Sequence, residues 1–119
     1  MYPSGAWRGY WEQRGWGRQP MEPLFLVFSG GTVRGEGRDI IGAFTFSGSY
    51  DNEGHVTLTK QYVGRHSVLY HGTYDGEGTI FGRWSIGEIW SGPFALSSVA
   101  EIDVADEPIY EIRPVPAPI

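Results

Sequence analysis

The sequence predicts an all-β protein, a single closed antiparallel barrel of about eight strands in up-and-down order. Three observations carry this prediction. Apolar and polar residues alternate with period two in short segments, and no apolar pattern of helical period lasts three turns without a glycine or a proline. Glycine makes up 18 of the 119 residues and marks the turns between these segments. Glycines also recur inside the segments, where they permit the sharp coiling of a small closed sheet: Gly42, Gly48, Gly72, Gly82 and Gly92.

The turns delimit the expected strands. Residues 29–32, Ser-Gly-Gly-Thr, suit a two-residue hairpin, because glycine accepts the positive φ that such turns need. The segment 50–56 is echoed by 74–80, and both have the composition of hairpin turns. In chain order, we expect strands at 6–14, 22–29, 32–38, 40–48, 55–62, 66–74, 79–86 and 90–98.

Hairpins throughout imply a meander, and eight meandering strands can close on themselves, which removes the exposed edges of an open sheet. A two-sheet β-sandwich is the alternative that the same strand count permits. We assign residues 1–100 to this domain. Residues 101–119 form an acidic, proline-rich tail, for which docking as an extra strand on the barrel is one expectation.

Composition limits the partners and the location. A net charge of −5 argues against a nucleic-acid partner, since phosphate contacts need a positive surface. The chain has no cysteine, which excludes disulfides, thiolate metal sites and a cysteine nucleophile. No apolar run approaches the ~20 residues that span a membrane, and the first residues lack the layout of a secretory signal. We therefore expect a cytoplasmic protein without a membrane partner.

A meander places alternate turns at opposite ends of the barrel, and these ends differ in charge. The turns near 30, 52 and 76 share an end that is acidic, with Asp51, Glu53, Asp75 and Glu77. The connections near 17, 39, 64 and 88 share the other end. That end is basic and aromatic, and its residues include Arg14, Trp16, Arg18, Arg38, Arg65, His66 and Trp90, with Asp39 and Glu88 as counter-charges.

One lysine stands on the apolar face of its strand. Period two places Lys60 on the same face as Val56, Leu58 and Tyr62. An ammonium inside a barrel needs a partner, and the sequence offers two, Asp39 and Glu88. Alternatively, the stem of Lys60 lies along the wall and its ammonium reaches water. We expect a ligand-binding site at this mouth, formed by Lys60, Tyr62, His66, Tyr70, Trp84, Trp90, Arg38 and Asp39.

Other chemistry has little support in the sequence. The three histidines are dispersed, so no metal site is expected. The acidic turns lack the spacing of a calcium-binding loop. The glycine pairs at 35–37 and 76–78 precede no helix that could cradle a phosphate, and no cofactor is expected. An acid–base pair of Asp39 with His66 or Tyr62 is the one catalytic arrangement that the meander suggests.

Gly5-Ala6-Trp7 enters the first strand, and this pattern resembles the Gly-x-Trp that opens barrels of the calycin group, which comprises lipocalins, fatty-acid-binding proteins and avidins. The resemblance implies that Trp7 closes one end of the barrel and packs on a basic residue from late in the chain, for which Arg113 is the candidate. It also implies a barrel that holds a small hydrophobic molecule. The chain is shorter than a lipocalin and lacks that family's disulfides.

The function expected from the sequence is non-catalytic binding of a small anionic, partly apolar ligand at the basic mouth. This function requires an internal cavity of a few hundred Å3, the lower end of ordinary ligand pockets. One alternative is a protein-interaction or self-associating barrel, such as a homodimer, without a ligand. Another is an enzyme of isomerase or hydrolase type that uses the same mouth.

Overall fold

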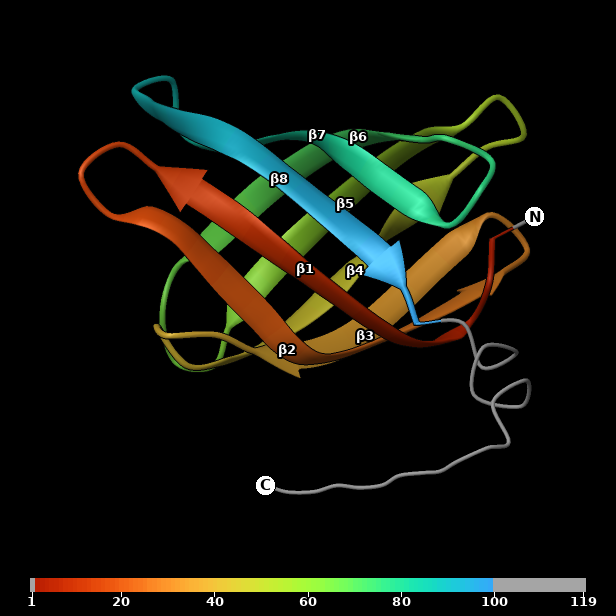
Figure 1. Ribbon diagram of the computed structural model, residues 1–119, viewed down its shortest axis with the longest axis horizontal. Helices are drawn as coiled ribbons and strands as arrows, with labels where there is room; N and C mark the ends of the chain where they lie inside the picture. The colour runs from red at the N-terminus through yellow and green to blue at the C-terminus, as the bar shows by residue number, and fades with distance from the viewer. Residues whose placement is uncertain (1, 100–119) are drawn as a thin grey trace, which may run out of the picture.

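The chain folds into a closed eight-stranded barrel (Figure 1). The computed structural model describes residues 2–99. The strands are β1 Gly5–Gln13, β2 Gly17–Ser29, β3 Thr32–Arg38, β4 Ala43–Tyr50, β5 His55–Tyr62, β6 Ser67–Tyr74, β7 Thr79–Ile86 and β8 Trp90–Ser98. Each strand pairs antiparallel with the next, and β1 pairs with β8 to close the sheet. The predicted all-β class and up-and-down order are confirmed, and the two-sheet alternative is wrong.

Period-two alternation decides which side chains enter the barrel. In β5, Val56, Leu58, Lys60 and Tyr62 are buried, and every residue between them is exposed. The same alternation along the other strands fills the interior with apolar side chains. The buried apolar residues are Trp7, Trp11, Met21, Leu24, Leu26, Val33, Phe44, Phe46, Val56, Leu58, Tyr62, Val68, Tyr70, Ile80, Trp84, Phe94 and Leu96.

Two strand boundaries differ from the prediction by more than two residues. β2 begins at Gly17 instead of residue 22, because it continues through Pro20, which lies opposite Tyr10 of β1. Proline cannot donate a hydrogen bond to a ladder, so a proline inside a segment weakens the sequence signal for a strand. β4 begins at Ala43 instead of residue 40, because the backbones of Asp39 and Gly42 exchange two hydrogen bonds of 3.1 Å and form a tight turn.

The glycines inside the strands lie where neighbouring backbones approach closely. A Cβ at Gly48 would lie 1.9 Å from the carbonyl oxygen of Thr57, and one at Gly82 would lie 2.0 Å from that of His71. Gly72 and Gly92 also lie within strands, as predicted. The placement of Gly42 within a strand is wrong, since it ends the β3–β4 connection.

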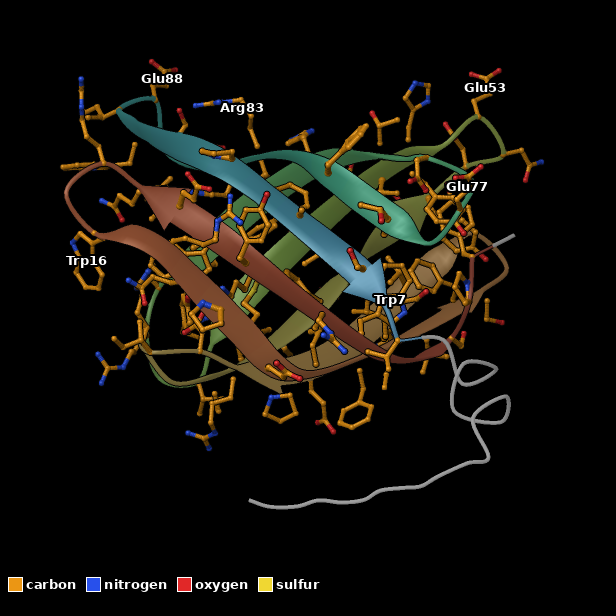
Figure 2. The ribbon with its side chains drawn as sticks, viewed as in Figure 1. Trp7, Trp16, Glu53, Glu77, Arg83 and Glu88 are labelled. Carbon is orange, nitrogen blue, oxygen red and sulfur yellow. The ribbon has the colours of Figure 1, made fainter. Side chains whose placement is uncertain are left out.

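The two ends of the barrel carry the charges expected of a meander. The β1–β2, β3–β4, β5–β6 and β7–β8 connections lie at one end, which we call the basic end (Figure 1). The other three connections and the segment before β1 lie at the acidic end. Figure 2 shows Trp16 and Glu88 at the basic end, and Glu53 and Glu77 at the acidic end.

Trp7 is buried in β1, and its indole nitrogen donates a hydrogen bond of 2.9 Å to the carbonyl oxygen of Pro3. Its ring lies 5.7 Å from that of Phe28, on the side of the acidic end.

Arg113 and the proposed tail, 101–119, lie outside the described residues. Residues 2–99 contain no helix with the length and apolar character needed to cross a membrane.

Candidate functional site at the basic end

A lysine and an aspartate form an ion pair inside the barrel near the basic end. The distance from Lys60 Nζ to Asp39 Oδ2 is 2.7 Å, and the two side chains are 1% and 0% exposed. Of the two partners that the sequence offered, Asp39 is therefore the one in contact. Glu88 lies exposed on the β7–β8 connection (Figure 2). The alternative in which the Lys60 ammonium reaches water is wrong.

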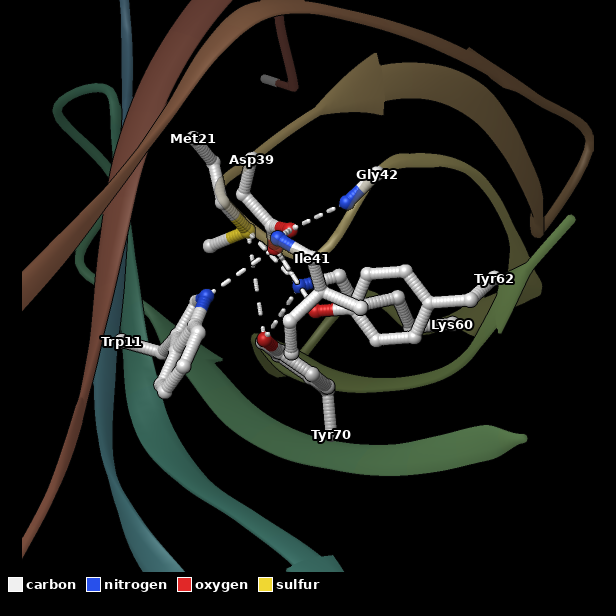
Figure 3. Close-up of polar contacts among 8 residues, drawn as sticks. All are labelled: Trp11, Met21, Asp39, Ile41, Gly42, Lys60, Tyr62 and Tyr70. Carbon is white, nitrogen blue, oxygen red and sulfur yellow. Dashed lines mark hydrogen bonds and ion pairs between the residues drawn. The ribbon is translucent and has the colours of Figure 1, made fainter. Parts of the chain in front are cut away.

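Three donors from two strands converge on one carboxylate oxygen (Figure 3). Asp39 Oδ2 accepts hydrogen bonds from Lys60 Nζ at 2.7 Å, the Tyr62 hydroxyl at 2.7 Å and Trp11 Nε1 at 3.0 Å. A buried carboxylate needs such donors, because it has lost its hydration. The connection that carries Asp39 is thus held to β1 and β5.

The other oxygen of Asp39 orients the side chain. Asp39 Oδ1 accepts hydrogen bonds from the backbone N–H of Ile41 at 2.9 Å and of Gly42 at 3.4 Å. An aspartate at the start of a turn forms such local hydrogen bonds readily. The turn therefore directs the carboxylate into the barrel.

The Lys60 ammonium has polar and aromatic neighbours besides Asp39. It donates to the Tyr70 hydroxyl at 3.1 Å and contacts Met21 Sδ at 3.4 Å. Its nitrogen lies 4.3 Å from the ring centroid of Phe44 and 4.7 Å from that of Tyr62, within the range of cation–π attraction. Ring faces and oxygens together replace the water that burial removes.

The environment sets the protonation of this centre. Burial lowers the pKa of Lys60 to about 8, and the attraction of Asp39 opposes the fall. Burial disfavours the Asp39 carboxylate, but Lys60 and the hydrogen bonds outweigh it and hold its pKa below the usual value. Burial, then Asp39, raises the pKa of Tyr62 and Tyr70 well above the usual range. At neutral pH the centre is an ion pair with two neutral phenols, and it carries no net charge.

A small cavity opens beside this ion pair. Its volume is about 50 Å3. The expected internal cavity of a few hundred Å3 is wrong, because tryptophan, tyrosine and phenylalanine rings fill the interior. The cavity is lined by Trp11, Gln13, Ile41, Tyr62, His66, Val68, Tyr70, Trp84 and Ile86.

The eight predicted site residues fall into three groups. Four of them line the cavity: Tyr62, His66, Tyr70 and Trp84. Two form the ion pair behind its lining: Asp39 and Lys60. The remaining two are exposed and do not line it: Arg38 and Trp90. His66 is itself exposed, with its ring 5.1 Å from that of Tyr62.

Sequence reasoning missed several residues of this centre. Met21 fell outside the predicted second strand, which was started too late. Ile41 was assigned to a strand instead of the turn that covers the cavity. Trp11 was not among the predicted site residues, and only the closed sheet brings its indole nitrogen to Asp39. Period-two alternation could have identified Trp11, since it lies two residues from Gln13 at the same mouth.

All four connections at the basic end carry an exposed apolar side chain. Nine large apolar residues are exposed in the described part of the chain, and five of them lie at this end. Their exposed fractions run from 53% to 83%. We call this set the apolar rim: Trp16, Ile40, Val63, Ile89 and Trp90. Such clustering at one end is characteristic of an interaction surface.

Three arginines accompany the apolar rim. Arg14, Arg38 and Arg65 are exposed on or beside the same connections, and none forms an ion pair within residues 2–99. Arg18, in contrast, is paired with Glu12 at 2.8 Å.

No family model and no curated protein matches this chain.

Proposed function

We propose that this protein is a non-catalytic binding barrel whose basic end holds an acidic protein segment with an apolar anchor. The anchor enters the cavity, and the apolar rim and the arginines contact the residues beside it. The observation that carries the proposal is the apolar rim, because every connection at the basic end of the barrel presents an exposed apolar side chain.

The size of the cavity supports an anchor rather than an enclosed ligand. A water molecule needs roughly 10–15 Å3 of such volume. About 50 Å3 therefore corresponds to the end of one side chain and is well below the volume of ordinary small-molecule pockets. A molecule of that size would leave the apolar rim in water, whereas a chain segment can fill the cavity and cover the rim.

The charge of the end supports an anionic partner. Lys60 contributes no net attraction, since Asp39 neutralises it inside the barrel. Arg14, Arg38 and Arg65 are exposed at this end and form no ion pair within residues 2–99, and arginine forms two-pronged hydrogen bonds with carboxylates. Charge of this kind at the edge of an interface mainly guides association and selects the sign of the partner.

The two other functions have weaker support. A small anionic, partly apolar molecule, the function first expected from the sequence, would have to fit the 50 Å3 cavity. An isomerase- or hydrolase-like reaction would need an acid–base pair that faces the cavity. His66 and Tyr62 line the cavity, but Asp39, the partner expected for either of them, does not.

A peptide titration tests the proposal. The probe is a blocked acidic hexapeptide with one central leucine, added to 15N-labelled protein at low ionic strength. We expect saturable amide shifts confined to the four connections of the basic end. Ile40→Ser and Ile89→Ser should each weaken binding by about tenfold, because each removes a largely exposed apolar side chain from the contact surface. The same peptide with lysine in place of its acidic residues should not bind.

Val27→Ser is the matched control, because Val27 is also an exposed apolar residue, at 57%, but lies on the outer wall of β2. It should leave the affinity unchanged. Shifts induced by hexanoate but not by the peptide would contradict a protein partner and would indicate a small molecule as the ligand of the basic end. No shift at the basic end with either probe, or equal losses in the control and the rim variants, would contradict the proposal.

A further inference from the structure

We infer that the acidic end carries a second binding site, which holds an organic cation of the alkylammonium or guanidinium class. This site is at the opposite end of the barrel from the apolar rim and does not depend on the function proposed for that rim.

The site is built from four aromatic rings that come from four elements. Tyr2 precedes β1, Phe28 lies near the end of β2, and Tyr50 and Tyr74 end β4 and β6. The ring of Tyr2 lies 5.1 Å from that of Phe28 and 4.4 Å from those of Tyr50 and Tyr74. All four side chains are half-buried, so part of each remains accessible. We call these four residues the aromatic cup.

The aromatic cup borders a cavity at the acidic end of the barrel. Its volume is about 520 Å3, ten times that of the cavity at the basic end and within the range of ordinary ligand pockets. Besides the cup, the lining consists of the two hairpin turns: Asn52, Glu53, Gly54, Asp75 and Gly76. One wall is therefore aromatic and the other polar and acidic.

The carboxylates of these turns are held in place as anions. Asp75 Oδ1 accepts hydrogen bonds from the backbone N–H of Glu77 at 2.7 Å and of Thr79 at 3.0 Å. These hydrogen bonds lower the pKa of Asp75. No cation pairs with Asp75 among residues 2–99, whereas Asp51 of the other acidic turn contacts His55 Nδ1 at 2.8 Å.

This combination selects a positively charged organic group. The face of an aromatic ring carries negative charge density, so a cup of rings attracts a cation and also shields its alkyl groups from water. Carboxylates at the border repel anions. An exposed aromatic surface without charge would accept any apolar group, so the test compares a cation with its neutral equivalent.

The probes are choline and its neutral isostere 3,3-dimethyl-1-butanol, titrated into 15N-labelled full-length protein. We expect saturable shifts at Gly54, Gly76 and the cup residues with choline, and at least fivefold weaker binding of the isostere. Nα-acetyl-arginine amide serves as a second arm. Binding of both cations indicates basic side chains of a partner, and binding of choline alone indicates a small quaternary amine; either result supports the site.

Asp75→Asn is the decisive variant, because an asparagine retains the acceptor that closes the turn and loses the charge. We expect it to weaken choline binding by about fivefold, whereas Glu36→Gln, the same change on the exposed face of β3, should have no effect. Preserved spectra away from the turn would show that both variants fold. Equal binding of choline and its isostere, or no shift with any probe, would show that the cup only covers the end of the barrel, and would overturn the inference.

Discussion

Asp39→Asn should lower the free energy of unfolding by about 3–5 kcal/mol at pH 7, because it leaves the Lys60 ammonium buried without a counter-charge. The substitution keeps the shape of the side chain and an acceptor for the N–H of Ile41. The loss therefore reports the charge and not the turn. Urea unfolding followed by tryptophan fluorescence measures it, and the slope with denaturant should stay the same.

The double variant Asp39→Asn with Lys60→Met is the control for this prediction. Methionine fills a similar volume without a charge, so the double variant should recover most of the stability that the single variant loses. A single variant that loses less than about 1 kcal/mol would contradict a dry, closed ion pair. It would instead indicate that water reaches Lys60 when Asp39 is neutralised.

The effect of Asp39→Asn should decrease as the pH rises from 7 to 9. In the folded protein the pKa of Lys60 is lowered to about 8, below its unfolded value of 10.5, so the unfolded chain binds more protons between these values and stability increases there with pH. Asp39 supports the charged form of Lys60, and without it the pKa falls further. In the variant Lys60 therefore loses its proton at a lower pH than in the native protein, and a neutral lysine no longer destabilises the interior. A loss that stays constant from pH 7 to 9 would contradict this assignment.

Gly48→Ala should destabilise the barrel by about 3 kcal/mol or prevent folding. Its Cβ would lie 1.9 Å from the carbonyl oxygen of Thr57 and 2.9 Å from the Cα of Leu58, and both are backbone atoms of the paired strand β5. Backbone cannot rotate away as a side chain can, so β4 and β5 must separate. Thermal unfolding measures the effect, which we expect to exceed a 10 °C fall in Tm.

Ser49→Thr is the matched control, because it adds a methyl group to the neighbouring exposed position of β4. It should change the stability by less than about 0.5 kcal/mol. If Gly48→Ala were equally mild, the close approach of β4 and β5 would not be a constraint on this barrel.

Residue types and their alternation along the strands predicted part of the site at the basic end. Alternation along β5 placed Lys60 inside, and the meander brought Asp39 to the same end, so the ion pair was one of two that the sequence proposed. The choice between Asp39 and Glu88 required the turn of residues 39–42, whose hydrogen bonds aim one carboxylate inward. The site residue Trp90 lies on the same side of its strand as Gly92 and Phe94, but at the opening of the barrel it is exposed.

By itself, the sequence determined the strands, their order and the opposite charges of the two ends. These features follow from local periodicity, from turn chemistry and from the rule that successive turns of a meander lie at opposite ends of the barrel. Only the tertiary structure decided the volume of the interior and the contacts of the buried charge. Cavity volume is the small difference between the space that the sheet encloses and the side chains that fill it, and no local pattern in the chain records that difference. The aromatic cup was equally invisible, since Tyr2, Phe28, Tyr50 and Tyr74 are distant in sequence and meet only when the barrel closes.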